Sequence, residues 1–151
     1  MVSYRKGIIL FLALVLPVLI FLFLKFFGRN QFDLPVFHTN SAEWPANCPP
    51  PGQFPFRVPV QSLGLKNRPA ILFLAEPEIE ASKRIPVEID TTQFQFLRLL
   101  DSTDPCAFGA PSGTSAVLID PTGNIRGIFA ALERDETDRL IMESKILLND
   151  Y

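Results

Sequence analysis

The sequence predicts a small α/β domain that follows a single membrane-spanning helix. Three observations support this prediction. An uncharged apolar run covers residues 7–24, strand-like patterns occur between residues 69 and 130, and an amphipathic helical pattern closes the chain. Because the chain has 151 residues, it has room for one domain besides the apolar run.

The apolar run has the length and composition of a transmembrane helix. From Gly7 to Leu24 it contains no charged or amide side chain. About 20 helical residues, rising 1.5 Å each, cross a hydrocarbon core of roughly 30 Å. Pro17 lies in the middle of the run, where it kinks a membrane helix without breaking it. A signal peptide would be shorter and would end in a small-residue cleavage site, which is missing here. We therefore expect a cytoplasmic segment at residues 1–6 and an uncleaved helix at residues 7–27.

Charge and cysteine content favour a location of the domain outside the cytoplasm. Arg5, Lys6 and Lys25 lie in the first 27 residues, so the remaining segment keeps 11 of the 14 basic residues against all 16 acidic ones, a formal charge of −5. This balance does not suit nucleic-acid binding. The positive-inside rule slightly favours an N-in orientation, and a disulfide would persist only in an oxidising compartment. We expect a single-pass protein of the inner (cytoplasmic) membrane, in contact with membrane lipid, with its C-terminal domain in the periplasm.

Residues 28–60 are predicted to form an extended, proline-rich arm. Proline fixes φ and removes a hydrogen-bond donor, so neither a helix nor a central strand can run through this stretch. The arm also carries aromatic side chains, which predict that it packs on a protein surface. Its prolines and aromatic residues are Pro35, Pro45, Pro49, Pro50, Pro51, Pro55, Pro59, Phe32, Phe37, Trp44, Phe54 and Phe56.

Residues 61–151 are predicted to form the α/β domain, and its first half has three patterned segments. The continuous apolar run at residues 70–75 predicts a central strand buried on both faces. Residues 77–84 are expected to form two helical turns, and the alternation at residues 87–91 predicts a second strand. Residues 93–100 fit either a strand or a short helix.

The second half of the domain predicts a β-hairpin and a final helix. Strands are expected at residues 116–119 and 125–130, joined by a turn at residues 120–124 that contains proline and glycine. Asp135 is expected to cap the helix. The helix would bury one face, made of Leu140, Ile141, Ser144, Leu147 and Leu148. The order strand, short helix, strand, variable segment, hairpin and helix predicts a thioredoxin-like domain.

Three segments resemble the Sco/SenC family. They are AVLIDPTGNIRGIF at residues 116–129, RDETDRLIMESKILL at residues 134–148, and FDLPVF at residues 32–37, which looks like the segment after the anchor in Sco-type proteins of Bacteroidota. This family consists of membrane-anchored thioredoxin-like proteins that deliver copper to cytochrome c oxidase or reduce its cysteines. The resemblance implies the same fold and location here, and a respiratory complex as partner.

The copper ligands of that family are missing from the matching positions. The family has a Cys-x-x-x-Cys loop after the central strand and a histidine before the hairpin, a ligand set that suits copper. Here the loop reads Glu76-Pro77-Glu78-Ile79-Glu80, and residues 111–115 contain no histidine. The alternating glutamates are interpreted as a solvated face, and Ser112 to Ser115 as a turn without a partner base. We therefore expect no metal site and no cofactor.

The two cysteines are the remaining candidates for chemistry. Cys48 and Cys106 are 58 positions apart, unlike the short spacing of a redox motif, and we interpret them as a structural disulfide. A displaced thiol or copper pair is the alternative, with His38, the single histidine, as a third ligand.

The sequence therefore favours a protein that is not an enzyme. The leading hypothesis is a non-catalytic, Sco-like binding or assembly module associated with cytochrome c oxidase or another respiratory complex. One alternative is an active thiol or copper protein that uses Cys48 and Cys106. Another is a structural subunit of a membrane complex, whose transmembrane helix makes most of the contacts.

Overall fold

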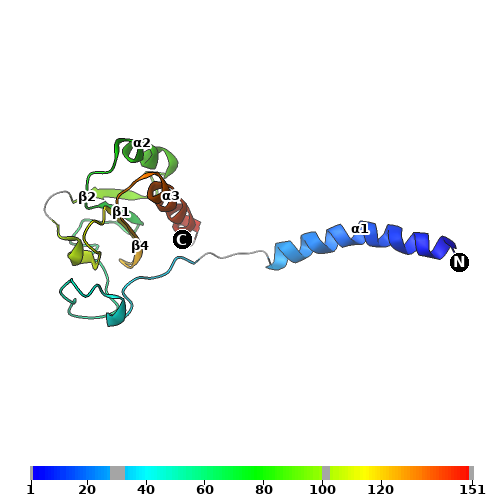
Figure 1. The fold of residues 1–151 in the computed structure, drawn as a ribbon, viewed down its shortest axis with the longest axis horizontal. Coiled ribbons are helices and arrows are strands. Elements are labelled where there is room, and N and C mark those ends of the chain that lie inside the picture. Colours follow the sequence, from blue (N-terminus) through cyan, green and yellow to red (C-terminus); the bar gives the residue numbers. More distant parts are fainter. Residues whose placement is uncertain (1, 28–32, 100–102, 150–151) are drawn as a thin grey trace. The chain divides into compact units, whose positions relative to one another are not determined.

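The chain has a mixed α/β structure with three helices and one four-stranded sheet among the described residues. The computed structural model describes residues 2–27, 33–99 and 103–149. It divides the chain into two compact units, Met1–Phe32 and Asp33–Tyr151. Each unit is described by itself below (Figure 1).

The N-terminal unit contains one helix, α1 (Val2–Phe27), with Pro17 inside it. Large apolar side chains such as Phe11, Leu14 and Phe26 are exposed along it. The helix expected at residues 7–27 is thus confirmed as a helix. Within the part of the chain that the structure describes, no helix is both long and apolar enough to count as a membrane span.

The second unit is built on a sheet with the strand order β2-β1-β3-β4. Its strands are β1 (Ala70–Phe73), β2 (Gln95–Arg98), β3 (Ala116–Ile119) and β4 (Ile125–Phe129). β1 pairs in parallel with β2 and antiparallel with β3, and β3 and β4 form an antiparallel hairpin. The predicted central strand and the predicted hairpin are both confirmed. Residues 93–100, whose pattern fitted either a strand or a short helix, contain β2. The last residue of this segment, Leu100, lies outside the described residues.

The hairpin contains a β-bulge that redirects its side chains. Leu118 pairs with Gly127 and Ile119 pairs with Ile125, so Arg126 has no counterpart on β3. The extra residue switches the face that β4 presents. Ile125 therefore packs on one side of the sheet and Phe129 on the other.

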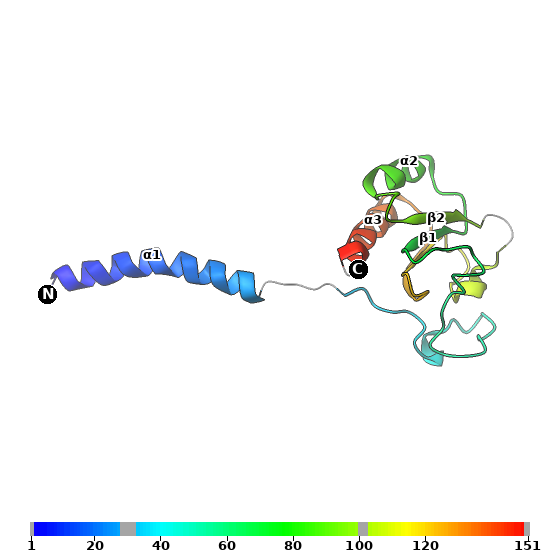
Figure 2. The same ribbon diagram turned by 180° about the vertical axis from the view of Figure 1, so that it is seen from behind.

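Both remaining helices cover the same face of the sheet (Figure 2). They are α2 (Ile79–Glu88) and α3 (Arg134–Asn149). Arg84 of α2 joins them through an ion pair with Asp138 of α3 at 2.7 Å, and it also pairs with Glu88 of its own helix at 3.0 Å. The core beneath them includes Ile71, Phe73, Ile85, Ile89, Leu118, Phe129, Leu140, Ile141 and Leu147. The predicted buried face of the last helix is confirmed at Leu140, Ile141, Ser144 and Leu147.

The proline-rich arm packs against the opposite face of the sheet. The structure describes it from Asp33 onward, so the first residues of the predicted arm, 28–32, lie outside the described residues. Its side chains join a second core that contains Phe37, Phe56, Val58, Leu63, Leu65, Leu72, Leu74, Val117, Ile119 and Ile125. The prediction that the arm packs on a protein surface is confirmed, and that surface is the chain's own sheet.

Two local predictions are wrong. No strand runs through residues 87–91, because α2 continues to Glu88 with Pro86 inside it. Ile85 and Ile89 are buried one helical turn apart, whereas Val87 is 83 % exposed. The apolar residues of this segment therefore follow the spacing of a helix, in which residues four apart share a face, and not the alternation of a strand. The short helix expected at residues 77–84 exists, but it begins two residues later and ends four residues later.

Asp135 is also not a cap, because α3 begins at Arg134 and Asp135 lies in its first turn.

Candidate functional site

The loop after β1 is the position where the resemblance implies metal-binding cysteines, and here it carries only exposed carboxylates. Glu76, Glu78 and Glu80 all face solvent. Glu76 makes an ion pair of 3.5 Å with Arg98, and both side chains are more than half exposed. Such surface pairs contribute little to stability. The interpretation of these glutamates as a solvated face is confirmed.

The segment before β3 is a turn that leads into the strand, as predicted. The hydroxyl of Thr114 donates a hydrogen bond to the carbonyl oxygen of Pro111 at 2.8 Å. The backbone N–H of Ser115 donates to Phe129, and its carbonyl oxygen accepts from Leu74. These residues are therefore occupied in joining β3 to its neighbours.

Cys48 and Cys106 are brought together at disulfide distance. Their sulfur atoms lie 2.09 Å apart and their Cα atoms 5.1 Å apart. Cys106 belongs to the short helix η2 (Pro105–Phe108), and its backbone N–H donates to the capping carboxylate of Asp104. Because Cys48 lies in the arm, the bond ties the arm to the segment before the hairpin. While the disulfide is intact, neither sulfur is available as a thiolate nucleophile or metal ligand.

His38 is buried within the arm, next to Trp44. It is 2 % exposed, and its imidazole meets the Trp44 ring edge-on at a centroid distance of 4.9 Å. Neither ring nitrogen has a hydrogen-bond partner among the described residues. Burial lowers the pKa of His38, and this effect is partly offset by the nearby Glu43. Within the described part of the chain, no group of three His, Cys, Asp or Glu side chains is arranged to hold a metal ion.

Sequence reasoning missed a buried ion pair between Asp120 and Arg126. The Asp120 side chain is fully buried and lies 2.9 Å from the Arg126 guanidinium. Arg126 also donates to the carbonyl oxygen of Leu34 in the arm, at 2.8 Å. Burial would raise the pKa of Asp120, but hydrogen bonds from Thr122, Asn124 and Arg126 outweigh it and lower the pKa. The turn motif indicated Asp120 as a turn residue, but the contact with the arm has no sequence signature.

A close approach of the backbone explains the glycine in the same turn. The N–H of Val58 in the arm donates to the carbonyl oxygen of Gly123 at 2.8 Å. Gly123 has a φ of +90°, and a Cβ atom added there would lie 2.6 Å from the carbonyl oxygen of Val58. Only glycine fits without strain. The backbone of the hairpin turn therefore also binds the arm.

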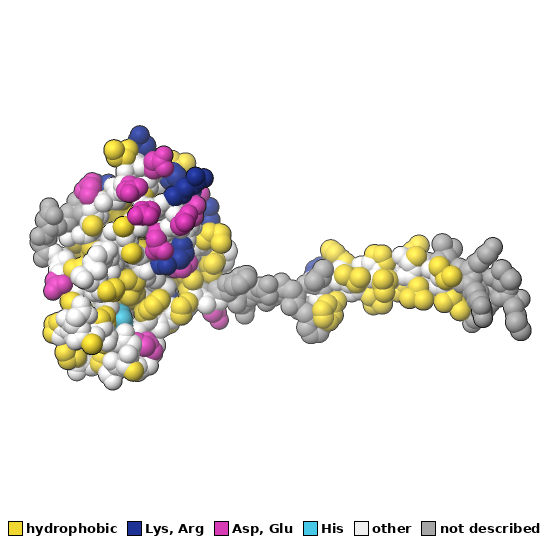
Figure 3. All heavy atoms as spheres, in the orientation of Figure 1, with side chains coloured by type: hydrophobic (Ala, Val, Ile, Leu, Met, Phe, Trp, Pro, Cys, Tyr) yellow, Lys and Arg dark blue, Asp and Glu magenta, His cyan; other side chains and the backbone are white. Residues whose placement is uncertain are grey.

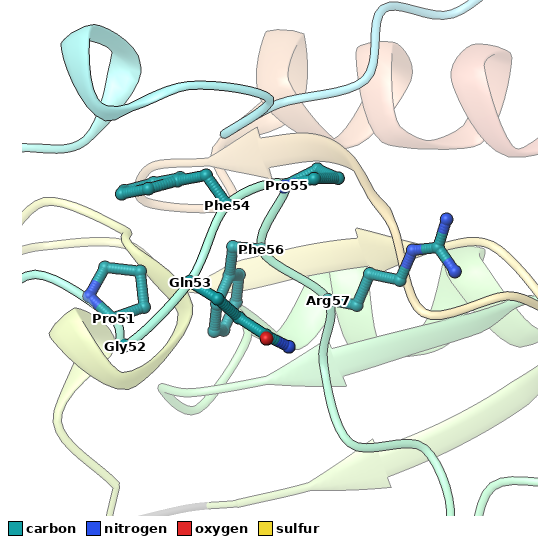
Figure 4. Close-up of a pocket in the computed structure, with 7 residues that line it drawn as sticks. All are labelled: Pro51, Gly52, Gln53, Phe54, Pro55, Phe56 and Arg57. Atoms are coloured by element: carbon teal, nitrogen blue, oxygen red, sulfur yellow. The ribbon is translucent and has the colours of Figure 1, made fainter.

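Two of the surface hollows among the described residues are candidates for ligand sites. One runs along the arm loop from Pro51 to Arg57. Figure 4 shows that its side chains spread apart, with Phe54 and Arg57 pointing in opposite directions. The hollow therefore lacks the convergent polar groups typical of a small-molecule site. The other is a small apolar groove between α2 and β2, lined by Phe73, Pro77, Ser82, Ile85, Pro86, Phe96 and Arg98.

Comparisons with protein-family models, curated proteins and solved structures gave no match to this chain. The resemblance to the Sco/SenC family therefore stays a prediction. The geometry of the described residues offers a disulfide, a buried ion pair and an apolar groove. None of these brings together the nucleophile and base of an acyl-transfer or hydrolytic site.

We predict that the disulfide contributes substantially to the stability of the domain. Closing a loop of 58 residues stabilises a fold by about 4 kcal/mol in the chain-entropy model. Replacing both cysteines in a C48A/C106A variant should lower the free energy of unfolding by about that amount, measured by urea denaturation. Reduction of the wild-type protein should cause a similar loss, and the same reductant should not affect the variant. An unchanged midpoint after complete reduction would contradict the prediction.

Proposed function

We propose that this protein is a membrane-anchored, thioredoxin-like module that binds or helps to assemble an integral membrane complex without catalysing thiol or copper chemistry. The strand order supports the fold part of this proposal. A parallel β1-α2-β2 unit is followed by an antiparallel β3-β4 hairpin and α3, in one sheet ordered β2-β1-β3-β4. A thioredoxin-like domain has this arrangement. Because fold does not determine function, the chemistry must be argued from the site.

The loop after β1 carries the non-catalytic part of the proposal. It presents carboxylates, a proline and the exposed Ile79 where the Sco/SenC resemblance implies two thiols. The two cysteines of the chain lie elsewhere and are within bonding distance of each other. A copper or thiol enzyme needs accessible thiolates. The side chains that remain in the loop can contact a partner protein, but they cannot carry out thiol or copper chemistry.

The sequence carries the anchoring part of the proposal. The run from Gly7 to Leu24 is uncharged and long enough to cross a bilayer. The helical conformation of α1 satisfies its backbone hydrogen bonds internally, as lipid requires. A domain facing the periplasm is consistent with a disulfide, which persists in that compartment.

The surface of the domain offers a place for a partner to bind. Charged side chains gather over the part that carries α2 and α3, whereas the arm presents mainly apolar and uncharged groups (Figure 3). The apolar groove lies between α2 and the edge strand β2. An edge strand and an adjacent apolar groove suit an extended peptide. The choice of cytochrome c oxidase or another respiratory complex as partner rests on the sequence resemblance.

We predict that the full chain, purified with its disulfide intact, does not bind copper(I) and does not reduce a disulfide substrate. The matched control is E76C/E80C, which restores the Cys-x-x-x-Cys spacing in the loop after β1. Copper(I) bound per chain should be measured by competition with a chromogenic chelator. Binding should be absent in the wild type and present in the reduced control. Stoichiometric copper on the wild-type protein would sink the non-catalytic proposal.

We also predict that the domain, rather than α1, determines the partner. The full chain should be purified from mildly solubilised membranes, beside a variant whose residues 7–27 are replaced by an unrelated transmembrane helix. Respiratory complex subunits should accompany both forms, as identified by mass spectrometry. Loss of these subunits from the helix-exchanged variant alone would favour a structural subunit that binds through α1. Their absence from both forms would reject a respiratory partner.

A further inference from the structure

His38 combines three unfavourable features that the fold does not otherwise explain. Among the described residues it is the only non-glycine residue at positive φ, with φ of 61°. It is almost completely buried, and both nitrogens of its ring lack hydrogen-bond partners in the described structure. Buried polar groups are normally paired, and an unpaired one needs a reason.

The His38 ring lies where three segments of the domain meet. It packs edge-on against Trp44, and its backbone carbonyl oxygen accepts the N–H of Phe56 at 3.0 Å. On the other side lies Gly109, which ends η2 in a left-handed conformation. A Cβ atom added to Gly109 would lie 2.7 Å from Nε2 of His38 and 2.5 Å from the Trp44 ring. His38 and Trp44 therefore pack against the end of η2, in addition to the disulfide that ties the arm to the same short helix.

We propose that His38 is an acid-sensitive latch: its neutral imidazole holds the Trp44 segment of the arm against η2, and protonation releases that segment. An imidazolium has two N–H donors, and neither ring nitrogen of His38 makes a hydrogen bond among the described residues. The backbone of Glu43 and of Gly109 favours the charged ring, but burial outweighs both. Burying a charge is costly, so the protonated ring is better accommodated in water. Histidine is the side chain whose charge changes near neutral pH.

The charged groups around this seat do not cancel the effect. Glu43 is the nearest acid, and its carboxylate already accepts hydrogen bonds from Thr39 and Asn40. The η2 segment carries Asp104, which caps the N–H of Cys106, and Cys106 itself is in the disulfide. The segment at Phe56 is followed by Arg57, an exposed cation. Burial is the largest influence on His38 and lowers its pKa, while Glu43 and the backbone of Gly109 oppose it.

The direction of the pH response follows from this depressed pKa. The released histidine binds a proton at its ordinary pKa, near 6.5, whereas the docked histidine binds one only at lower pH. Docking is therefore fully favourable above about pH 6.5 and is lost as the pH falls towards the pKa of the docked state. The disulfide between Cys48 and Cys106 keeps the arm attached throughout, so the opening is confined to residues around Trp44.

Trp44 is the only tryptophan of the chain and reports directly on the latch. Its fluorescence and its quenching by acrylamide should be followed in the full chain, in detergent micelles, from pH 8 to pH 5. We expect a reversible red shift and stronger quenching on acidification, while the far-ultraviolet circular dichroism stays constant. The control is H38N, because asparagine tolerates positive φ and does not titrate. It should show no pH transition.

A second variant guards against a control that fails to fold. G109A places a methyl group against Trp44 and His38, so its tryptophan should be exposed at pH 8 as well as at pH 5. The latch is rejected if wild-type fluorescence is constant over this range. It is also rejected if H38N shows the same transition as the wild type, or if G109A keeps the tryptophan emission and the pH response of the wild type.

Discussion

The structure of this domain depends on covering the second face of its sheet. β1 and β3 are buried on both sides, yet both helices of the domain pack on one side only. Without a cover, the apolar side chains on the second face would be exposed to water and would promote aggregation. The proline-rich arm solves this problem by packing Phe37, Phe56 and Val58 onto the uncovered face.

Three kinds of contact hold the arm in place, and each suits a segment rich in proline. Backbone hydrogen bonds join Phe37 to Ile125 and Val58 to Gly123, at positions where the arm has an N–H to donate. Arg126 is the extra residue of the β-bulge, and its guanidinium reaches both Asp120 and the arm. The disulfide adds a covalent tie at Cys48, which lies between Phe37 and Val58 in the sequence. The arm is therefore part of the fold, although proline prevents it from forming a regular strand.

The sequence predicted the elements whose patterns are local. The run at residues 70–75, the hairpin and the last helix could be recognised because their periodicity follows directly from burial. The extent of α2 could not, because Ile85, Val87 and Ile89 fit a strand as well as a helix until the burial of each is known. The ion pair between Asp120 and Arg126 and the seat of His38 were missed because they depend on contacts between distant segments. The pairing of Cys48 with Cys106 was predictable because the chain has only two cysteines.

The central claim is that the arm is an integral layer of the domain. Amide hydrogen exchange at Phe37 and Val58, measured near pH 7.5, tests it most directly. Exchange as slow as that of the β3 amides is expected, because the arm should open only when the domain unfolds. Exchange at the rate of an unstructured peptide would contradict the account.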